Sequence, residues 1–363
     1  MPQHAERWHF EWRRTWSDVW SASFERTWRT LYEASPWAHV YHEPELVRAW
    51  ADTCGQAIGA EPMFGLARST SGVQLLLPWV VVRQAGRLAA RRTLAPAGSD
   101  FFGYHNPLLS GPAPDAIDWA LFWQSARAEV GSACDQALFR FLQPAYAPDI
   151  EGRLDSEDSP VLDLRGRPDL KSVLGVCSSS HRIDVQRQLR RLRERGAVSL
   201  WIAGSGEAVA AAAAVQSGLL PAHRALWNGR DRQNGLLRPG LEAFLEAVVA
   251  RGLPVGWTHV SVLRAGETPI AWHVGFADRG RMYWWLPTHD LAWSNHSPGK
   301  LLLALLIDAV CRAGWTEFHL LAGKHDYKAA WKPAPQRLAA IGWTAPTIRG
   351  RLMAWYDARR RAS

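Results

Sequence analysis

Residues 282–331, MYWWLPTHDLAWSNHSPGKLLLALLIDAVCRAGWTEFHLLAGKHDYKAAW, decide how this chain folds. The segment opens with a strand-like apolar run and passes through a loop into a helix, whose leucines recur at helical spacing until Gly314 ends it. A second strand-like run, residues 317–321, follows and leads to Gly323. This order of strand, helix and strand indicates a domain in which helices and a sheet are combined.

The helix start at residues 297–300 is a candidate site for a phosphate or pyrophosphate. Ser297 has a side chain suited to capping, and Pro298 lacks only a backbone donor that the first turn does not use. Gly299 lets a bulky ligand approach the backbone, whose free N–H groups and positive helix end attract an anion. Lys300 adds a mobile positive charge. The same four residues also fit an ordinary, well-capped helix.

The rest of the second half also alternates between strand and helix patterns. Ser178 to Arg195 form a basic helix that Gly196 ends. A helical pattern and four strand patterns follow it, at residues 236–252 and at residues 198–204, 257–266, 268–278 and 281–290. An antiparallel meander followed by a helix and another strand predicts an α+β fold with a mixed sheet.

The first half begins with a run of aromatic residues. Between residues 7 and 33 they follow a mostly i, i+4 spacing, from Trp8 to Trp28, which predicts a helix with one aromatic face. Residues 61–82 then form two strand-like runs separated by Ser-Thr-Ser-Gly, a hairpin signature.

The chain is long enough for two domains, since it has 363 residues of which 47% are hydrophobic. The acidic stretch at residues 147–170, which contains Pro and Gly, is the best boundary between them. We therefore expect an N-terminal lobe of residues 1–160 and a C-terminal lobe of residues 161–363.

Composition limits the class of protein. The net charge of +8 favours polyanionic partners such as a phosphate-bearing cofactor, a nucleic acid or a membrane surface. No apolar run is long enough to span a membrane and no secretory signal is visible, which predicts a soluble, cytoplasmic protein. The spacing of the four cysteines argues against a metal site. The sequence also lacks the nucleophile elbow, the phosphate-binding loop with its glycine spacing and the zinc-protease motif.

The motifs of residues 297–331 resemble those of the CelD/BcsL-like (cellulose biosynthesis acetyltransferase) branch of the GNAT superfamily, which is related to the Fem peptidyltransferases. The resemblance rests on Ser-Pro-Gly at residues 297–299 and on Gly-x-x-x-Tyr-Lys-x-x-Trp at residues 323–331. Looser similarities spread it over roughly residues 30–335, including the Gly-Ser-Asp loop at residues 98–100. It implies tandem GNAT-like lobes, each a mixed and mostly antiparallel sheet flanked by helices.

The activity that the resemblance implies is transfer of an acyl group from acyl-CoA, such as acetyl-CoA, to an amine, with no metal and with the donor held in the C-terminal lobe. Such a reaction needs a route for the amine proton, a donor to the developing oxyanion and a proton for the leaving group. The expected donor-binding residues are His296, Ser297, Pro298, Gly299, Lys300 and Gly323.

Catalytic candidates lie on both sides of this loop. Lys328 is the expected stabiliser of transition-state charge, Asp326 would orient it, Tyr327 and Tyr283 are candidate general acids, and His289 is a candidate base.

The acceptor amine is expected to meet Asp100 from the first lobe, with Tyr104 and His273 as further substrate-binding candidates. In the related proteins a tyrosine often follows the aspartate directly, whereas here Phe101 and Phe102 intervene before Tyr104.

Two other functions fit the same residues. A Fem-like ligase would take its aminoacyl group from tRNA, and the basic helix at residues 181–195 and the Arg-rich end of the chain suit such a carrier. No long insertion for a helical-hairpin arm is visible, which argues against it. A GNAT-fold pair without catalysis would act as a binding protein, although the Ser-Pro-Gly and Tyr-Lys motifs argue against that role.

Overall fold

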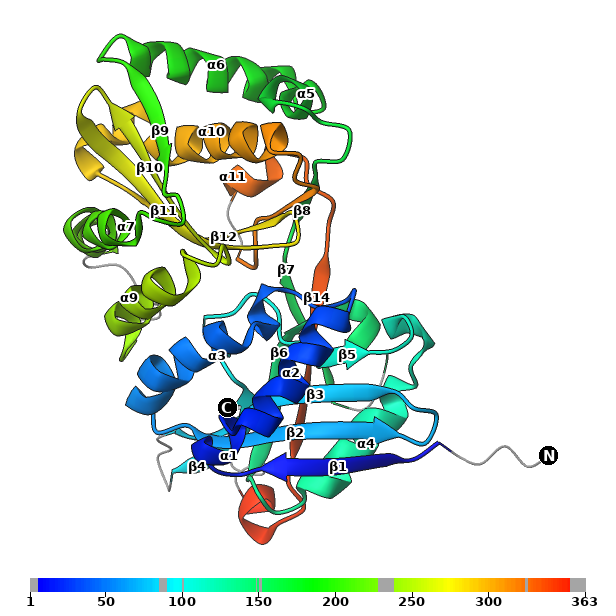
Figure 1. Ribbon diagram of the computed structural model, residues 1–363. Helices are drawn as coiled ribbons and strands as arrows, with labels where there is room; N and C mark the ends of the chain where they lie inside the picture. Colours follow the sequence, from blue (N-terminus) through cyan, green and yellow to red (C-terminus); the bar gives the residue numbers. More distant parts are fainter. Residues whose placement is uncertain are drawn as a thin grey trace. The chain divides into compact units, whose positions relative to one another are not determined.

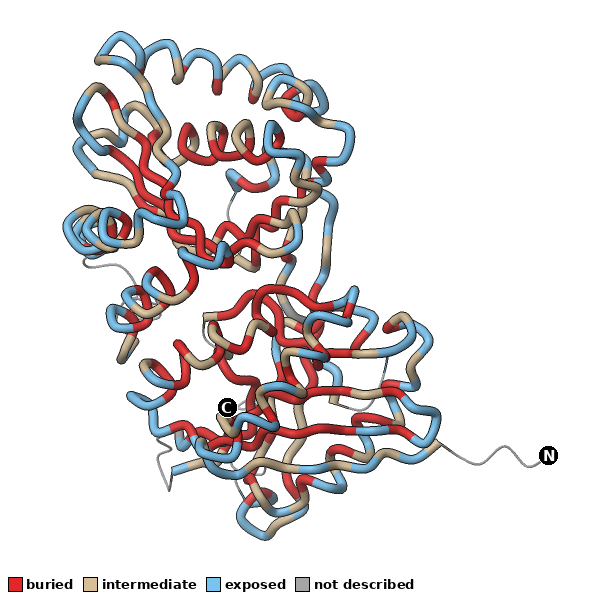
Figure 2. Tube along the Cα trace, in the orientation of Figure 1, coloured by how far each residue is buried: buried red, intermediate tan, exposed pale blue. Residues whose placement is uncertain are grey.

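The computed structural model describes residues 6–84, 90–99, 101–147, 149, 152–227, 238–323 and 326–352. The chain forms two compact units, Met1–Glu157 with Arg337–Ser363 and Asp158–Gln336. Each unit has its own sheet and its own hydrophobic core (Figures 1 and 2).

The first unit is built on an eight-stranded sheet in the order β1-β2-β3-β4-β6-β14-β7, with β5 paired to β3. Its strands are β1 (Trp8–Arg13), β2 (Glu61–Ser69), β3 (Gln74–Gln84), β4 (Arg91–Pro96), β5 (Leu108–Ser110), β6 (Gln136–Leu142), β7 (Arg153–Asp158) and β14 (Arg337–Thr344). Its helices are α1 (Trp16–Val19), α2 (Ala22–Ala34), α3 (Pro44–Trp50) and α4 (Trp119–Val130), with short turns of other helix types at η1 (Val40–His42), η2 (Ala51–Gly55), η3 (Pro114–Ala116) and η4 (Pro144–Tyr146).

The second unit has a six-stranded sheet in the order β8-β13-β12-β11-β10-β9. Its strands are β8 (Val161–Asp163), β9 (Val198–Ile202), β10 (Thr258–Ala265), β11 (Thr268–Asp278), β12 (Arg281–His289) and β13 (Glu317–His319). Its helical segments are α5 (Leu170–Gly175), α6 (Ser179–Arg193), α7 (Ala208–Ala214), η5 (Val215–Leu219), α8 (Leu220–Trp227), α9 (Leu241–Gly252), η7 (Leu291–His296), α10 (Pro298–Arg312) and α11 (Asp326–Ala329).

The two faces of the second sheet are covered by different helices, as Figure 1 shows. Met282 and Phe318 belong to the core that the leucines of α10 complete, whereas Trp285 packs edge-on against Phe244 of α9. Because neighbouring side chains of a strand point to opposite faces, these contacts show that Met282 and Phe318 point to the α10 face of the sheet and Trp285 to the α9 face.

Each sheet has one parallel pair of strands, β4 with β6 and β12 with β13, joined in each case by a connection that contains a long helix. The pairing of β12 with β13 covers only residues 281–283 and 317–319. Since β12 continues to His289, the two strands separate beyond His319 and leave a wedge between them.

A bulge interrupts β12 next to this wedge. Trp284 and Trp285 stand together opposite Gly275 of β11, because Val274 pairs with Leu286 and Phe276 pairs with Tyr283. A bulge re-aims side chains at the place where it occurs. Trp284 lies on the α10 face with Met282, Trp285 lies on the α9 face, and the bulge shifts the pairing of the residues that follow.

The predicted α+β fold with two lobes, each a mixed and mostly antiparallel sheet flanked by helices, is confirmed. The strand, helix and strand expected within residues 282–331 are present as β12, α10 and β13. In the part of the chain that the structure describes, no helix is both long and apolar enough to cross a membrane.

Two expectations from the sequence need correction. Residues 8–13, predicted as part of one aromatic helix, form β1, which pairs with β2 from Trp8 opposite Ser69 to Arg13 opposite Phe64. Residues 337–344, assigned to the C-terminal lobe, form β14 and pair with β6 of the first unit. Ala339 and Ile341 of β14 are buried in the first core, so burial there decides where this strand belongs.

Candidate active site

A cavity of about 320 Å³ lies in the second unit between β12 and the start of α10. Its lining combines strand residues, helix-start residues and one tyrosine: Trp284, Pro287, Thr288, His289, Ser294, Ser297, Pro298, Gly299, Lys300 and Tyr327. Residues 297–300, which the sequence indicated as a site for phosphate, thus share one cavity with His289 and Tyr327.

The first turn of α10 leaves its backbone donors open to this cavity. Ser297 adopts a left-handed conformation, with φ 51° and ψ 49°, and its side chain makes no capping hydrogen bond. The capping role expected for Ser297 is therefore wrong. Among the described residues, the N–H groups of Gly299 and Lys300 have no acceptor, and both residues line the cavity. Free N–H groups at a positive helix end form a binding site for an anion.

In the first unit, the start of the equivalent helix, α4, is capped by a side chain. Asp118 caps α4, and its carboxylate accepts a hydrogen bond from Leu121 N at 2.9 Å. A carboxylate already occupies the positive end of α4, and it would repel a second anion. The start of α10 thus differs from that of α4, because no carboxylate caps it.

Gly299 is not required by packing or by backbone conformation. A Cβ atom added to Gly299 would have its nearest neighbour, His289 Nδ1, at 3.6 Å, which is an ordinary contact. The glycine therefore leaves open space on the cavity side of the helix start, as expected for a backbone that a ligand approaches closely.

The sequence predicted Lys300 as a mobile positive charge, but in the structure its side chain forms an ion pair. Its ammonium donates to Asp184 of α6 at 2.5 Å, and this pair is about one-quarter exposed on each side, 29% and 24%. Lys300 thus links α10 to α6, and the carboxylate offsets part of the positive charge at the cavity.

Trp284 and Tyr327 both line the cavity; Trp284 is buried, whereas Tyr327 is 37% exposed. The indole Nε1–H of Trp284 donates to the hydroxyl of Tyr327 at 3.3 Å. Burial raises the pKa of Tyr327, against a lowering effect of the bond from Trp284. The tyrosine is therefore protonated at neutral pH, and its oxygen accepts the hydrogen bond from Trp284.

Lys328 lies beside the wedge, and its side chain points to backbone carbonyl groups. Its ammonium donates to the carbonyls of Leu321, Ala322 and Gly323, at 2.9, 3.1 and 3.2 Å, and the residue is only 5% exposed. Lys328 thus holds the turn after β13 in place. A role in stabilising transition-state charge remains a prediction, and the structure adds a structural role to it.

The other predicted residues of this segment are dispersed. His289 lines the cavity, and burial lowers its pKa, so that it is neutral at pH 7. Asp326 is exposed at the start of α11, and Gly323 has a positive φ of 116° that suits glycine. His296 packs against Trp293 at 5.6 Å, outside the set of residues that lines the cavity.

Neither His273 nor Tyr104, two of the three acceptor candidates, lines this cavity. His273 is fully buried on β11, where its ring stacks on Trp284 with the ring centres 4.2 Å apart, so Trp284 separates it from the cavity. Tyr104 is buried in the first unit against Tyr41. Asp100 lies outside the described residues.

One pair of residues was missed by the sequence analysis. Glu317 and His319 alternate on β13, and His319 Nε2 lies 2.9 Å from a carboxylate oxygen of Glu317. The ring of His319 stacks on that of Tyr283, another predicted catalytic residue, with centres 4.7 Å apart. The i, i+2 spacing on a predicted strand was the signal that could have revealed this pair.

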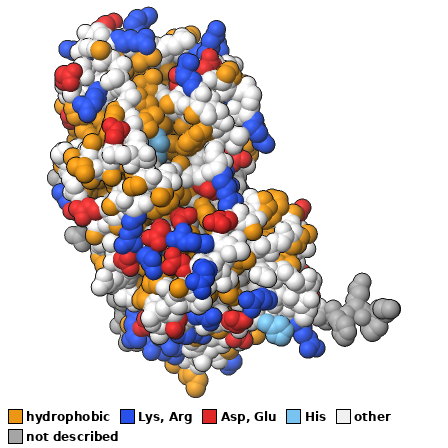
Figure 3. Space-filling view, viewed as in Figure 1, with side chains coloured by type: hydrophobic (Ala, Val, Ile, Leu, Met, Phe, Trp, Pro, Cys, Tyr) orange, Lys and Arg blue, Asp and Glu red, His pale blue; other side chains and the backbone are white. Residues whose placement is uncertain are grey.

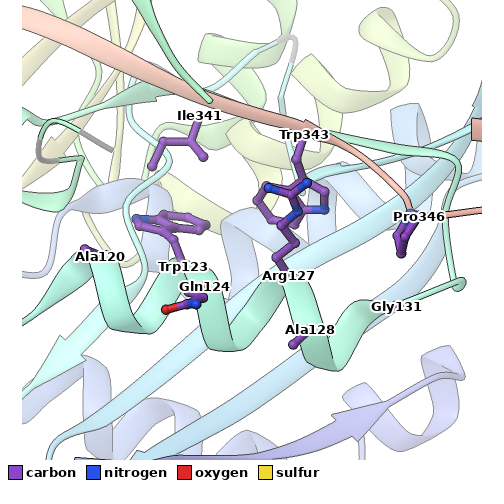
Figure 4. Close-up of a pocket in the computed structure, with 9 residues that line it drawn as sticks. All are labelled: Ala120, Trp123, Gln124, Arg127, Ala128, Gly131, Ile341, Trp343 and Pro346. Atoms are coloured by element: carbon purple, nitrogen blue, oxygen red, sulfur yellow. The ribbon is translucent and has the colours of Figure 1, made fainter. Parts of the chain in front are cut away.

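A second cavity, of about 550 Å³, lies in the first unit between α4 and β14. Figure 4 shows its lining, in which Trp123 and Arg127 of α4 face Ile341 and Trp343 of β14. None of the predicted site residues lines it. Among the described residues, no group of three or more His, Cys, Asp or Glu is arranged to hold a metal ion.

Among known proteins, a family model matches most of the second unit. Residues 179–329 match the family model described as "Acetyltransferase (GNAT) domain", a range that contains every residue lining the 320 Å³ cavity. No curated protein matches the chain in sequence.

Several solved structures resemble the fold of both units. One is the C-terminal domain of a putative lysylphosphatidylglycerol synthetase from Agrobacterium fabrum, with a TM-score of 0.53 and 16% identity over 87% of this chain and 96% of that one. FemX gives a TM-score of 0.54 and 7% identity, over 86% of this chain and 95% of that one. A conserved protein of unknown function from Bacteroides thetaiotaomicron gives 0.52 and 9%, over 93% of this chain and 100% of that one. At these identities the resemblance concerns the fold.

Proposed function

We propose that the second unit is an N-acyltransferase that takes an acyl group from acyl-CoA and passes it to an amine. The observation that carries the proposal is a cavity lined both by an open helix start and by Trp284, the first residue of β12 beyond its parallel pairing with β13. The match of residues 179–329 to a GNAT acetyltransferase domain supports the same class of reaction. Envelope polysaccharide or a small amine metabolite would supply the acceptor.

The phosphates of the donor bind at the start of α10. The N–H groups of Gly299 and Lys300 donate to them, and the helix dipole adds to the attraction. Ser297 and Pro298 shape the same end of the cavity, and His289 faces Gly299 across it.

The extended arm of the donor runs along β12 towards the wedge. From His289 back to Trp284 the strand covers about 16 Å, at roughly 3.3 Å per residue. The acyl carbonyl then lies near the bulge at Trp284 and Trp285, where the ladder to β11 is interrupted and backbone donors are not used in the regular way.

Tyr327 completes the reaction as the acid. The amine nitrogen attacks the acyl carbon, the C–N bond forms, and the bond from carbon to the thiol sulfur then breaks. The attacking nitrogen releases its proton to solvent, the leaving thiolate takes a proton from the hydroxyl of Tyr327, which is protonated at neutral pH, and solvent then reprotonates the tyrosine. Trp284 fixes the position of that hydroxyl through its indole hydrogen bond.

Titration calorimetry with acetyl-CoA tests this donor site. Gly299→Trp should fill the cavity and abolish binding, whereas Gly299→Ala should retain it within about threefold, because an added Cβ meets only an ordinary contact. Circular dichroism controls for folding of both variants. Equal affinity of the Gly299→Trp variant and the unmodified protein would refute the assignment, as would the absence of any acetyl-CoA binding.

Aminoacyl-tRNA is the second candidate donor, and α6 is the observation that favours it. Arg190, Arg191 and Arg193, together with Arg195 beyond the helix, are exposed and form no ion pair with any described residue. Figure 3 shows basic side chains along the edge of the second unit that carries α6. A polyanion bound there would release counterions, so its affinity would fall steeply with salt.

A gel shift with bulk tRNA at low and moderate salt separates the two donors. We expect weak binding and a clear thermal shift with acetyl-CoA, because the open helix start is compact and the arginines are spread along a helix face. Tight, salt-sensitive tRNA binding that is lost on replacing Arg190, Arg191 and Arg193 with alanine, without any response to acetyl-CoA, would reverse this preference.

A further inference from the structure

Strand β9 forms one edge of the second sheet (Figure 1), and one side of its backbone has no partner among the described residues. It pairs with β10 alone, from Val198 opposite Ala265 to Ile202 opposite Ser261. None of its five residues is buried, and Ile202 is 37% exposed. An unpaired edge of this kind is where a further strand can add to a sheet.

The register of β9 shows which of its backbone groups point outward. The pairing with β10 continues one residue beyond the strand, where Ala203 N donates to Val260 O at 3.0 Å. In an antiparallel pair, residues that bond to the partner strand alternate with residues whose N–H and C=O groups point away from it. The odd-numbered residues of β9 therefore bond to β10, whereas Val198, Leu200 and Ile202 present their N–H and C=O groups to the open side.

Strand β9 also lacks the features that keep an edge strand from pairing. Its sequence, Val-Ser-Leu-Trp-Ile, contains no charged residue and no proline, and its register against β10 has no bulge. Strand β1, at one edge of the first sheet, instead carries Glu11 and Arg13, and Glu11 pairs with Arg68 of β2. Because charges on an edge strand oppose the addition of another strand, β9 is the better suited of these two edges.

The charges at the two ends of β9 are of opposite sign. Arg193 and Arg195 precede the strand and Glu207 follows it, and all three residues are exposed. The carboxylate of Glu207 accepts from Trp201 Nε1 at 3.4 Å and from Gly204 N at 2.7 Å, which holds it close to the end of the strand. Among the described residues, none of these three charges has an ion-pair partner. If two β9 strands pair antiparallel, the arginines of each copy meet the glutamate of the other.

We propose that a second copy of this chain pairs with β9 about a two-fold axis, so that the second sheets of the two copies become one continuous sheet. Leu200 then lies opposite its own counterpart, and Val198 lies opposite Ile202 of the partner subunit. All of these residues present their backbone groups outward, so about six N–H···O bonds form. A two-fold contact is closed and satisfies both open edges at once, which favours a second copy over an unrelated strand. The inference does not depend on the proposed acyl transfer.

Analytical ultracentrifugation of the full-length protein tests this pairing. The measurement is made at about 0.15 M salt, where the Debye length of about 8 Å leaves only the charges near the junction effective. We expect a monomer–dimer equilibrium between roughly 1 and 100 µM, because one short strand from each copy gives a small interface. A protein that remains monomeric throughout this range would overturn the proposal.

Two variants of Ile202 form a matched pair, because both place a charge at the same exposed position. In the dimer this position is at the end of the strand where Arg193 and Arg195 of the partner subunit lie. Ile202→Lys should weaken dimerisation at least about tenfold by repulsion, whereas Ile202→Glu should keep the Kd within about threefold. Circular dichroism and thermal melting control for folding. Equal dimer affinities of the two variants would refute this arrangement.

Cysteine cross-linking tests the register of the two strands. Ser199 lies opposite Trp201 of the partner subunit, with Cα atoms about 4.5 Å apart, which a disulfide can bridge. Two copies of the same residue are offset by two positions and lie about 8 Å apart, which is too far for a disulfide. The four cysteines of the chain are buried and do not compete.

A mixture of the Ser199→Cys and Trp201→Cys variants should therefore form a disulfide-linked dimer under mild oxidation, and neither variant should do so by itself. Gel electrophoresis without reductant detects the dimer, and mass spectrometry of the linked peptides identifies the two residues. No cross-link in the mixture, or equal cross-linking of each variant by itself, would overturn the proposed pairing.

Discussion

The indole of Trp284 donates to the hydroxyl of Tyr327, so the start of α11 is tied to β12 beside the cavity that both residues line. The bond connects two segments that lie 43 residues apart in the chain. It holds the hydroxyl of Tyr327 beside the cavity that both residues line.

The first prediction follows from this contact. Tyr327→Phe keeps the ring and removes only the hydroxyl, so turnover should fall about 100-fold while the Kd for acetyl-CoA changes less than about twofold. Single-turnover kinetics and calorimetry measure the two quantities. A loss of donor affinity of the same size as the loss of turnover would show that Tyr327 is a binding residue.

The second prediction concerns Lys328. Lys328→Met removes the donor for three carbonyls at once, and buried carbonyls left without partners should cost about 2–4 kcal/mol of unfolding free energy. Denaturant titration measures the loss, with Lys328→Arg as the control that retains a charged donor. If turnover alone falls and stability is unchanged, the transition-state role expected from the sequence is the correct one.

The third prediction concerns the pair of Asp184 and Lys300. Asp184→Asn removes the carboxylate that competes with a bound phosphate for Lys300, so the affinity for acetyl-CoA should rise about three- to tenfold at low salt. The gain should shrink as salt is added, because the pair is partly exposed and screened. Unchanged affinity in calorimetry would show that Lys300 does not reach the donor.

The fourth prediction concerns stability in acid. His259 and His273 are buried on the α10 face of the second sheet, and burial lowers the pKa of His259 to about 4 and that of His273 well below 6.5. Between pH 6.5 and about 4 the unfolded chain binds these protons and the folded chain does not, so stability falls as the pH falls. Each histidine contributes about 1.4 kcal/mol per pH unit.

Amide hydrogen exchange of β10 and β11 at pH 7 and pH 5 measures this slope. Replacing His273 with methionine should flatten it, whereas His9→Gln on the exposed strand β1 should leave it as it is. An equal slope in the His273→Met variant would place the acid sensitivity elsewhere in the second unit.

Local pattern was sufficient for β12, α10 and β13, because each has the period of its element and a clear end signal, whereas the short helical turns η7 and α11 were not predicted. It was ambiguous for residues 8–13. Trp8 and Trp12 fit an i, i+4 helix and also the i, i+2 alternation of a strand, and pairing with β2 settles the choice. Gly65 of β2 leaves the space that the ring of Trp12 occupies, a complementarity that only the folded sheet reveals.

The candidate site was foreseen in part for the same reason. Residues 297–300 and Tyr327 were indicated by local motifs, and the structure brings them to one cavity. The left-handed Ser297 and the bond from Lys300 to Asp184 depend on how α10 meets η7 and α6, so no local pattern reports them. The stacking of His319 on Tyr283 likewise needs the parallel pairing of two strands that are separated by a helix.

The position of β14 has a consequence for synthesis on the ribosome. This strand lies between β6 and β7 in the first sheet, yet it is translated after the whole of the second unit. Until residues 337–344 emerge, β6 and β7 lack the partner strand that lies between them, and open strand edges are where chains mispair and aggregate. The second unit is continuous in sequence and does not wait for a later strand, so nascent chains should complete the second unit while the first unit still needs chaperone protection.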